Sequence, residues 1–224
     1  MKRIIYTLLA TIAVTHLTAQ SQQSDTPCRM GWGIRTSIDI NIPGHLRGNG
    51  ESVKMFKNGA GINIAAVYTM PLGRYLFFQP GAGMFYDTYR YDDITISAEP
   101  GEGQHVVDPA VRKLGIRIPL HFGYNLDIWE NAAISFYTGP QFDYSFYGRV
   151  SASSNGIDWS DSYNEDLFGP YNQRRFDIAW KVGVGLPMNH WYVGLEAAFG
   201  LLDLMRTDFT YHENRVSLTL GYNF

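Results

Sequence analysis

Histidine and serine are the residue types here that could do nucleophilic chemistry, because a histidine beside a serine hydroxyl can act as its general base. None of the six histidines is followed two positions later by a serine. Only His121 lies inside a regularly alternating segment, where a hydrogen-bonding packing role is the simpler interpretation. We therefore do not expect catalysis. The histidines are His16, His45, His105, His121, His190 and His212.

The sequence contains no pattern typical of a metal or cofactor site. No group of histidine, cysteine or carboxylate residues has the spacing of a metal site. The acidic stretches Asp92-Asp93 and Asp158 to Asp166 could collect calcium weakly, although solvated loop charge is the simpler interpretation. Gly81-Ala82-Gly83 and Gly183-Val184-Gly185 precede no helix pattern, so they are not phosphate loops. We expect no metal and no cofactor.

The first residues have the pattern of an export signal. Lys2 and Arg3 precede an apolar run from Ile4 to Leu17, which is too short to span a bilayer. Ala19 supplies the small residue before a cleavage site. We predict a signal peptide over residues 1–19 and a periplasmic segment over residues 20–30. The alternative, a buried helix, lacks a cap and is followed by polar residues.

The charge of the chain does not favour nucleic acid as a partner. The formal net charge is −3 at pH 7, and losing Lys2 and Arg3 with the leader lowers it by two, to −5, with no basic patch. The single cysteine, Cys28, cannot form an internal disulfide. It also does not sit directly at the cleavage point, where a lipid-modified cysteine would be.

Eight later segments alternate apolar and polar residues with a period of two, which predicts strands with two different faces. In the clearest segment, Trp180 and Val182 alternate with Ala179 and Lys181. No later segment is long and apolar enough for a transmembrane helix, so membrane insertion requires a closed barrel. The segments lie near residues 31–41, 61–70, 76–86, 114–124, 134–146, 175–186, 191–200 and 215–224.

Charged residues fall on only one face of these segments. A soluble sandwich or lipocalin with its apolar face inward would show the same alternation as a membrane barrel with its apolar face on lipid. Glycines such as Gly83, Gly183 and Gly194 share the charged face, and they would only weaken a solvated strand surface. The narrow lumen of an eight-stranded barrel, by contrast, needs small residues beside long ones. The predicted barrel-interior charges are Arg35, Asp39, Arg117, Asp143, Arg175, Asp177, Lys181 and Glu196.

The connections alternate in length, as short periplasmic turns and long extracellular loops do. The short ones lie near residues 71–74, 125–131 and 187–190, and the long ones near 42–58, 88–111, 147–173 and 201–213. We predict an all-β fold over residues 31–224, an up-and-down eight-stranded antiparallel transmembrane β-barrel. Its interfacial aromatic girdles would include Trp32, Tyr68, Tyr86, Tyr124, Tyr144, Trp191 and Tyr222.

One ion pair can be predicted inside this barrel. If the turn over Pro187 to His190 is symmetric, Leu186 faces Trp191 and Val184 faces Val193. Lys181 then faces Glu196 on the interior side. The alternative is that both residues find other partners or water, because a turn one residue longer on one side breaks the register.

Several loose motifs in a fixed order resemble the PorT-like outer-membrane β-barrels over the whole mature chain. The resemblance implies a barrel in the outer membrane of a Gram-negative-type cell, in contact with its lipids. It also implies that the terminal Tyr222 and Phe224 form the signal read by the barrel-assembly machinery. One namesake member is linked to a secretion system. The motifs are Leu114 to Leu120, Tyr137 to Gln141, Phe176 to Ile178, Gly183 to Gly185, Gly194-Leu195 with Gly200-Leu201, and Gly221 to Phe224.

The sequence leaves three function classes open. The expected one is a noncatalytic barrel that binds an unknown partner through its extracellular loops, or that supports a secretion or envelope assembly. The alternative is a lipid-modifying enzyme, such as a lipid A or phospholipid hydrolase. A narrow pore is the weakest option, because the side chains of eight strands fill the lumen.

Overall fold

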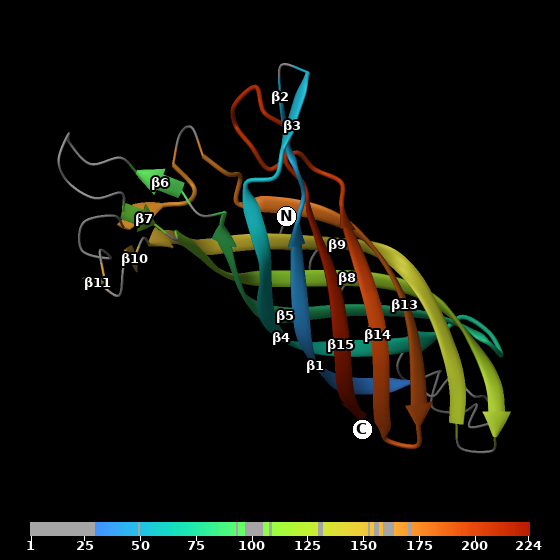
Figure 1. Cartoon of the computed structure of the whole chain (residues 1–224). Coiled ribbons are helices and arrows are strands. Elements are labelled where there is room, and N and C mark those ends of the chain that lie inside the picture. Colours follow the sequence, from blue (N-terminus) through green and yellow to red (C-terminus); the bar gives the residue numbers. More distant parts are fainter. Residues whose placement is uncertain are drawn as a thin grey trace, which may run out of the picture.

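The described residues form a closed antiparallel barrel (Figure 1). The computed structural model describes residues 30–48, 50–92, 94–96, 105–107, 109–129, 132–151, 153–154, 157–158, 164–169 and 172–224. The predicted signal peptide and Cys28 lie outside these residues. The barrel strands are β1 (Gly31–Pro43), β4 (Phe56–Pro71), β5 (Leu76–Tyr91), β8 (Ala110–Trp129), β9 (Ala132–Ser151), β13 (Phe176–Met188), β14 (Trp191–Gly200) and β15 (Glu213–Asn223).

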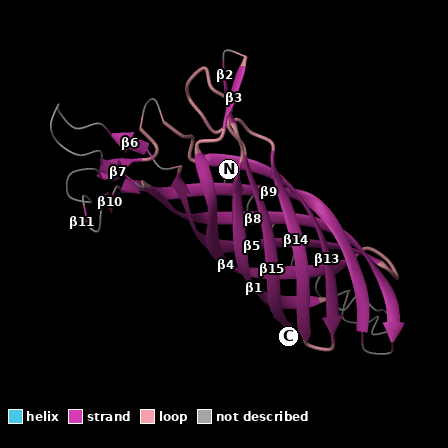
Figure 2. Ribbon diagram, viewed as in Figure 1, coloured by secondary structure: helices cyan, strands magenta, loops and turns pink. Residues whose placement is uncertain are grey.

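Each barrel strand pairs with its neighbours in the chain, and β1 pairs with β15 to close the sheet. Ile38 on β1, for example, lies between Leu218 of β15 and Ile62 of β4. Closure satisfies the backbone groups that an open sheet edge would expose to lipid. Only strands and loops are drawn in the described part of the chain (Figure 2). No helix there is long and apolar enough to cross a membrane.

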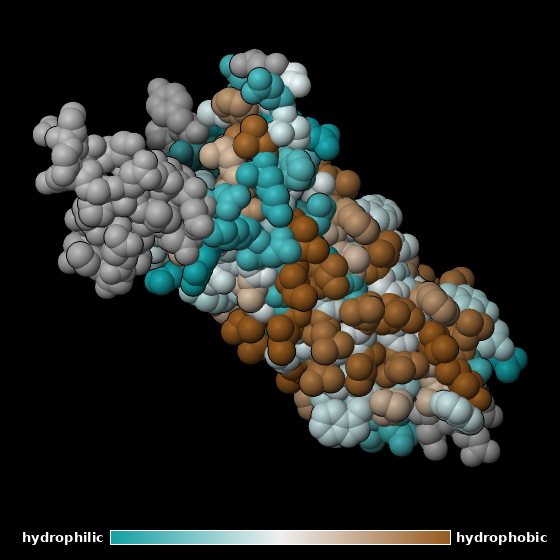
Figure 3. Space-filling view, in the orientation of Figure 1, coloured by the Kyte–Doolittle hydropathy of each residue, from teal (hydrophilic) through white to brown (hydrophobic). Residues whose placement is uncertain are grey.

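The apolar face of the strands points outward, as predicted. Ile38 is 65% exposed and Leu195 is 55% exposed, whereas Asp39 and Glu196, their neighbours in sequence, are buried. On the face in view, apolar side chains accordingly form a broad band across the barrel (Figure 3). The alternative of a soluble sandwich or lipocalin would have buried these residues, so the fold is a membrane barrel.

The interior glycines make room for aromatic rings more often than for charged side chains. A Cβ atom on Gly183 would lie 2.4 Å from Cζ of Tyr137, and one on Gly123 would lie 2.2 Å from Cζ of Phe77. A long charged side chain explains Gly221, whose Cβ would lie 2.6 Å from Cδ of Arg35. The prediction that small residues fill a crowded lumen is therefore sound, although aromatic rings account for much of the crowding.

Four strands extend well beyond their predicted ends on the extracellular side. β4 begins at Phe56, β5 continues to Tyr91, β8 begins at Ala110, and β9 continues to Ser151. Above the apolar band the outer face of these strands becomes polar, as at Arg112 and Arg149, whereas Tyr89 and Val111 are buried. The pattern of outward apolar residues therefore ends, although the hydrogen-bonded ladder continues.

Short strands occupy the long extracellular loops. β2 (Leu46–Gly48) and β3 (Glu51–Val53) form a hairpin that projects from the barrel (Figure 1). β12 (Asn164–Asp166) pairs with the outer end of β9. A separate small sheet contains β6 (Ile94–Ile96), β7 (His105–Val107), β10 (Ser153–Ser154) and β11 (Ile157–Asp158).

The turn between β13 and β14 is shorter than predicted, and it corrects the register. β13 runs through Pro187 to Met188, which lies opposite Trp191, so only Asn189 and His190 form the loop. Asn189 adopts a φ of 51°, the left-handed region that two-residue hairpin loops require. Leu186 therefore lies opposite Val193 rather than Trp191. A shift of two residues keeps every side chain on its predicted face.

Candidate functional site

A buried ionic layer crosses the barrel interior around Arg117 of β8. Its guanidinium bonds to Asp39 of β1 at 2.9 Å, to Asp87 of β5 at 3.0 Å and to Asp143 of β9 at 3.0 Å. The same group lies 4.4 Å from the ring centroid of Phe85. Four strands thus meet at one side chain. The three carboxylates compensate the positive charge of the Arg117 guanidinium, which is buried inside the barrel.

Arg215 of β15 supplies a second cation to this layer. Its guanidinium lies 3.3 Å from a carboxylate oxygen of Asp143 and donates to Oδ1 of Asn41 at 3.2 Å. Ser37 and Gln141 donate further hydrogen bonds to Asp39 and Asp143 respectively. The layer is therefore a polar network that ties strands together from within.

Lys181 and Glu196 form the predicted ion pair, although they are not directly opposite each other. Lys181 lies opposite Ala198, and Glu196 lies opposite Gly183, so the two long side chains meet diagonally. The Tyr137 hydroxyl donates to Oε1 of Glu196 at 2.7 Å, and the Tyr192 hydroxyl donates to the Tyr137 oxygen at 2.8 Å. The ion pair and these two tyrosine side chains form a second layer of the interior.

An aromatic cluster lies beside this pair. Phe77, Tyr137 and Tyr192 are buried together. The guanidinium of Arg35 lies 4.2 Å from the ring centroid of Tyr192. The ring of His121 lies 5.0 Å from that of Tyr137 and is buried. His121 therefore packs in the interior and away from lipid, as expected, but its buried Nε2 lacks the expected hydrogen bond among the described residues.

An apolar cap closes the extracellular opening. Tyr211, which precedes β15, is fully buried in the cap, and burial together with the nearby Glu213 carboxylate raises the pKa of its phenol. Beneath the cap, Lys113 pairs with Glu213, and the amide of Gln173 donates to the Tyr89 hydroxyl oxygen at 2.9 Å. The cap consists of Phe56, Tyr89, Val111, Val150, Leu167, Phe168, Leu204 and Tyr211.

Two small cavities lie between these layers within the described part of the chain. One cavity, of about 20 Å³, lies beside Asp143 and Arg215, and another, of about 30 Å³, lies beside His121 and Glu196. Each holds roughly one or two water molecules. Within the described residues, no group of three or more histidine, cysteine or carboxylate residues could hold a metal ion.

Two of the eight charged residues predicted for the interior are less buried than the other six. Arg35, Asp39, Arg117, Asp143, Lys181 and Glu196 are buried. The side chain of Arg175 is 35% exposed and pairs at 3.4 Å with exposed Asp166, because Arg175 precedes β13 above the barrel rim. Asp177 is partly buried and lies opposite Asp143 across β13 and β9.

Sequence reasoning missed four charged residues of the network: Asp87, Lys113, Arg215 and Glu213. Asp87 and Lys113 lie just beyond the predicted ends of two strands, so following the alternation one step further would have found them. Arg215 is the first residue of the last predicted segment, but it is not among the eight predicted interior charges. Glu213 precedes that segment.

One histidine does contact a serine. Nδ1 of His45 lies 3.3 Å from Oγ of Ser52 across the exposed β2–β3 hairpin. No described carboxylate orients His45, and the pair stands outside the barrel. The predicted assembly signal lies at the other end, where Tyr222 and Phe224 are exposed and their rings meet edge to face at 5.5 Å.

Comparisons with solved structures give outer-membrane barrels as similar chains. Ail, the attachment invasion locus protein of Yersinia pestis, is 15% identical, with 88% of this chain and 100% of Ail covered at a TM-score of 0.41. Neisserial surface protein A is 13% identical, with 87% and 97% covered at 0.44. OprG from Pseudomonas aeruginosa is 9% identical, with 89% and 98% covered at 0.43. No match was found among curated protein sequences.

The family is established by sequence. A family model described as the outer membrane protein beta-barrel domain matches residues 18–206, most of the chain. That match agrees with the closed eight-stranded barrel and its apolar exterior. The chain is thus a member of the outer membrane protein β-barrel domain family, located in the Gram-negative outer membrane.

Proposed function

We propose that the protein is a noncatalytic envelope barrel that acts by binding a protein partner at its extracellular face. The observation that carries this proposal is the filled interior. The Arg117 layer, the aromatic cluster around Tyr137 and the extracellular cap lie in series, with cavities of only about 20 and 30 Å³ between side chains. Because these layers fill the interior formed by the described residues, a pore is the less suitable function.

The β2–β3 hairpin gives the extracellular face a defined surface. Arg47 and Thr210 exchange backbone hydrogen bonds of 3.0 and 2.7 Å, which fasten the hairpin to the loop before β15. Phe209 lies against Gly48, where an added Cβ would come within 2.3 Å of its ring. The hairpin is thus attached to the buried cap through this loop, and its second strand presents Glu51 and Val53 to solvent.

A photo-crosslinking amino acid at Val53 tests the proposal in intact cells. We expect it to capture a discrete protein, whereas the same group at Leu72, in the turn at the opposite end of the barrel, should not capture that protein. Equal capture at both positions, or none at Val53 and at Glu51, would count against a partner at this face.

The enzyme alternative has its own test. His45 and Ser52 contact each other, and His121 is buried, so these residues are the ones to change. We expect the Ser52→Ala and His121→Asn variants and a deletion strain to have the same outer-membrane lipids as wild type. Altered lipid acylation in the deletion strain and in either variant would support an enzyme instead.

The resemblance to PorT-like proteins supports a finer form of the proposal, in which the partner belongs to a secretion or envelope assembly. Cleavage after residue 19, a periplasmic segment to residue 30 and recognition of Tyr222 and Phe224 by the barrel-assembly machinery belong to the same proposal. Truncating Phe224 should then lower the amount of folded barrel in the outer membrane.

A further inference from the structure

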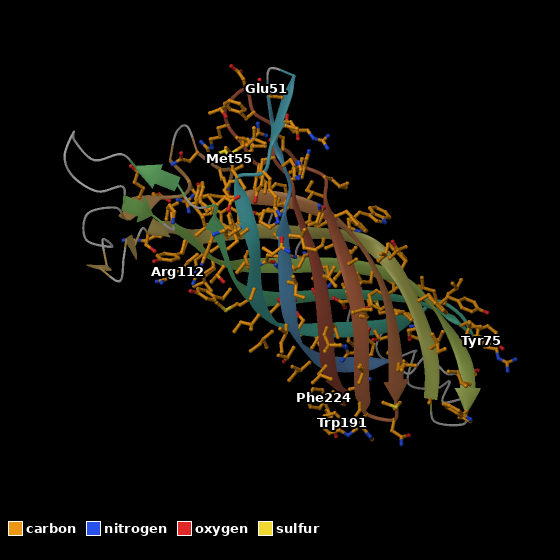
Figure 4. All side chains as sticks on the ribbon, viewed as in Figure 1. Glu51, Met55, Tyr75, Arg112, Trp191 and Phe224 are labelled. Carbon is orange, nitrogen blue, oxygen red and sulfur yellow. The ribbon has the colours of Figure 1, made fainter. Side chains whose placement is uncertain are left out.

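Two arginines lie side by side on the outer wall of the barrel at its extracellular end. Arg112 of β8 and Arg149 of β9 are directly opposite each other, and both are exposed. Their neighbours along each strand are buried, so both side chains point away from the lumen. Figure 4 shows Arg112 at the end of the barrel remote from Trp191 and Phe224.

Neither arginine has an acidic partner among the residues that the structure describes. Asp166 lies opposite Arg149 on its other side, but its carboxylate accepts bonds from Arg175 at 3.4 Å and from the backbone N–H of Phe168 at 3.0 Å. Like charges directly opposite in a sheet destabilise it. The arrangement therefore favours an anion that both guanidinium groups can share.

The position of the two arginines along the barrel axis places them near the lipid surface. Leu114 lies between Tyr86 and Tyr147, and this apolar row is two residues below Arg112 and Arg149, about 7 Å along the strands. Tyr86 is 39% exposed and Tyr147 is 42% exposed, as expected of an interfacial girdle. The guanidinium of Arg149 lies 5.7 Å from the ring of Tyr147. Both charges thus stand just above the apolar band.

We propose that Arg112 and Arg149 form a binding site for a phosphate group of an outer-leaflet glycolipid. The planar guanidinium matches phosphate oxygens in pairs, and two of them can hold one phosphate from both sides. The site faces sideways, where lipid head groups pack against the barrel, rather than upward into solvent. Arg90 and Lys57 lie further up the wall, and Asp92 pairs with Lys57 at 3.8 Å.

Native mass spectrometry of the refolded full chain with lipid A tests the site. We expect wild type to retain phosphorylated lipid A more strongly than dephosphorylated lipid A. Each of Arg112→Ala and Arg149→Ala should weaken retention of the phosphorylated form roughly fivefold. Arg206→Ala is the matched control, because it removes an exposed extracellular arginine that lies on a loop and should have no effect.

Three results would overturn the proposal: equal retention of the two lipid A forms, an equal loss in the Arg206→Ala variant, or displacement of lipid A by inorganic phosphate at similar concentration. The third would identify a general anion site rather than a lipid site. A heat-modifiable gel shift identical to that of wild type shows that each variant folds, so a loss of retention reports on the site.

Discussion

At the scale of single residues, the interior is organised by pairing rather than by position along the chain. Asp39 and Arg117 are 78 residues apart in sequence, yet they share a hydrogen bond. Alternation assigned each of them to the interior face, because a charge on the lipid face is costly. It could not assign partners, since which strands face each other across a lumen depends on closure and tilt.

The Lys181–Glu196 pair was predicted from one hairpin and is present despite the wrong register. Long side chains reach diagonal neighbours in a sheet, so a shift of two residues still left them in contact. If either residue had a short side chain, a register shift of two residues would have put the two side chains out of contact. The pair, rather than the register, is therefore the part that sequence could determine.

A double-mutant cycle should show that the two charges depend on each other. Lys181→Met or Glu196→Gln alone leaves one buried charge without its partner and should cost about 3–5 kcal/mol of unfolding free energy. The double variant should cost less than the sum of the two. Urea unfolding in lipid vesicles measures all three, with exposed Lys54→Met as a control expected near zero. Additive losses would mean that the ion pair contributes nothing of its own.

At the scale of elements, strand β13 shows what periodicity determines and what it leaves open. The face of each residue follows from the period of two, and the exposed Trp180 and Val182 agree with it. The turn does not follow, because a proline at Pro187 suggested that β13 had already ended. Pro187 instead stands in the ladder opposite Tyr192.

The lipid face of β13 can be tested at Val182. Val182→Arg places a charge in the apolar band and should lower the unfolding free energy in vesicles by about 2–4 kcal/mol. The control is Val53→Arg, at another exposed valine, in the extracellular hairpin, which should change little. If Val182→Arg unfolds at the same urea concentration as wild type, Val182 does not face lipid.

The turn of the same hairpin makes a separate prediction at Asn189. Its φ of 51° suits asparagine and glycine but not a β-branched residue. Asn189→Val should therefore destabilise the barrel by about 1–2 kcal/mol, whereas Asn189→Gly should be nearly neutral. Unfolding in vesicles distinguishes them. Equal stability of the two variants would argue for a different turn conformation.

At the scale of the whole molecule, the barrel combines a lipid-facing exterior with a solid interior. The number of strands, the alternation of short and long links and the orientation of the faces could all be read from the sequence. The extracellular cap could not, because Phe56, Leu167 and Tyr211 come from three different loops or strand ends with no shared pattern. Only folding brings them together over the opening.

This solid interior predicts that the protein does not conduct. The ionic layer at Arg117, the aromatic cluster at Tyr137 and Tyr192, and the apolar cap block the lumen in series, so opening one should leave the other two closed. Wild type and the Tyr137→Ala, Tyr192→Ala double variant should both be silent in planar bilayer recordings in which a porin gives regular current steps. Steady steps from wild type would show that the layers separate in a membrane. Steps from the double variant alone would show that the aromatic cluster is the single barrier, and that the ionic layer and the cap admit ions.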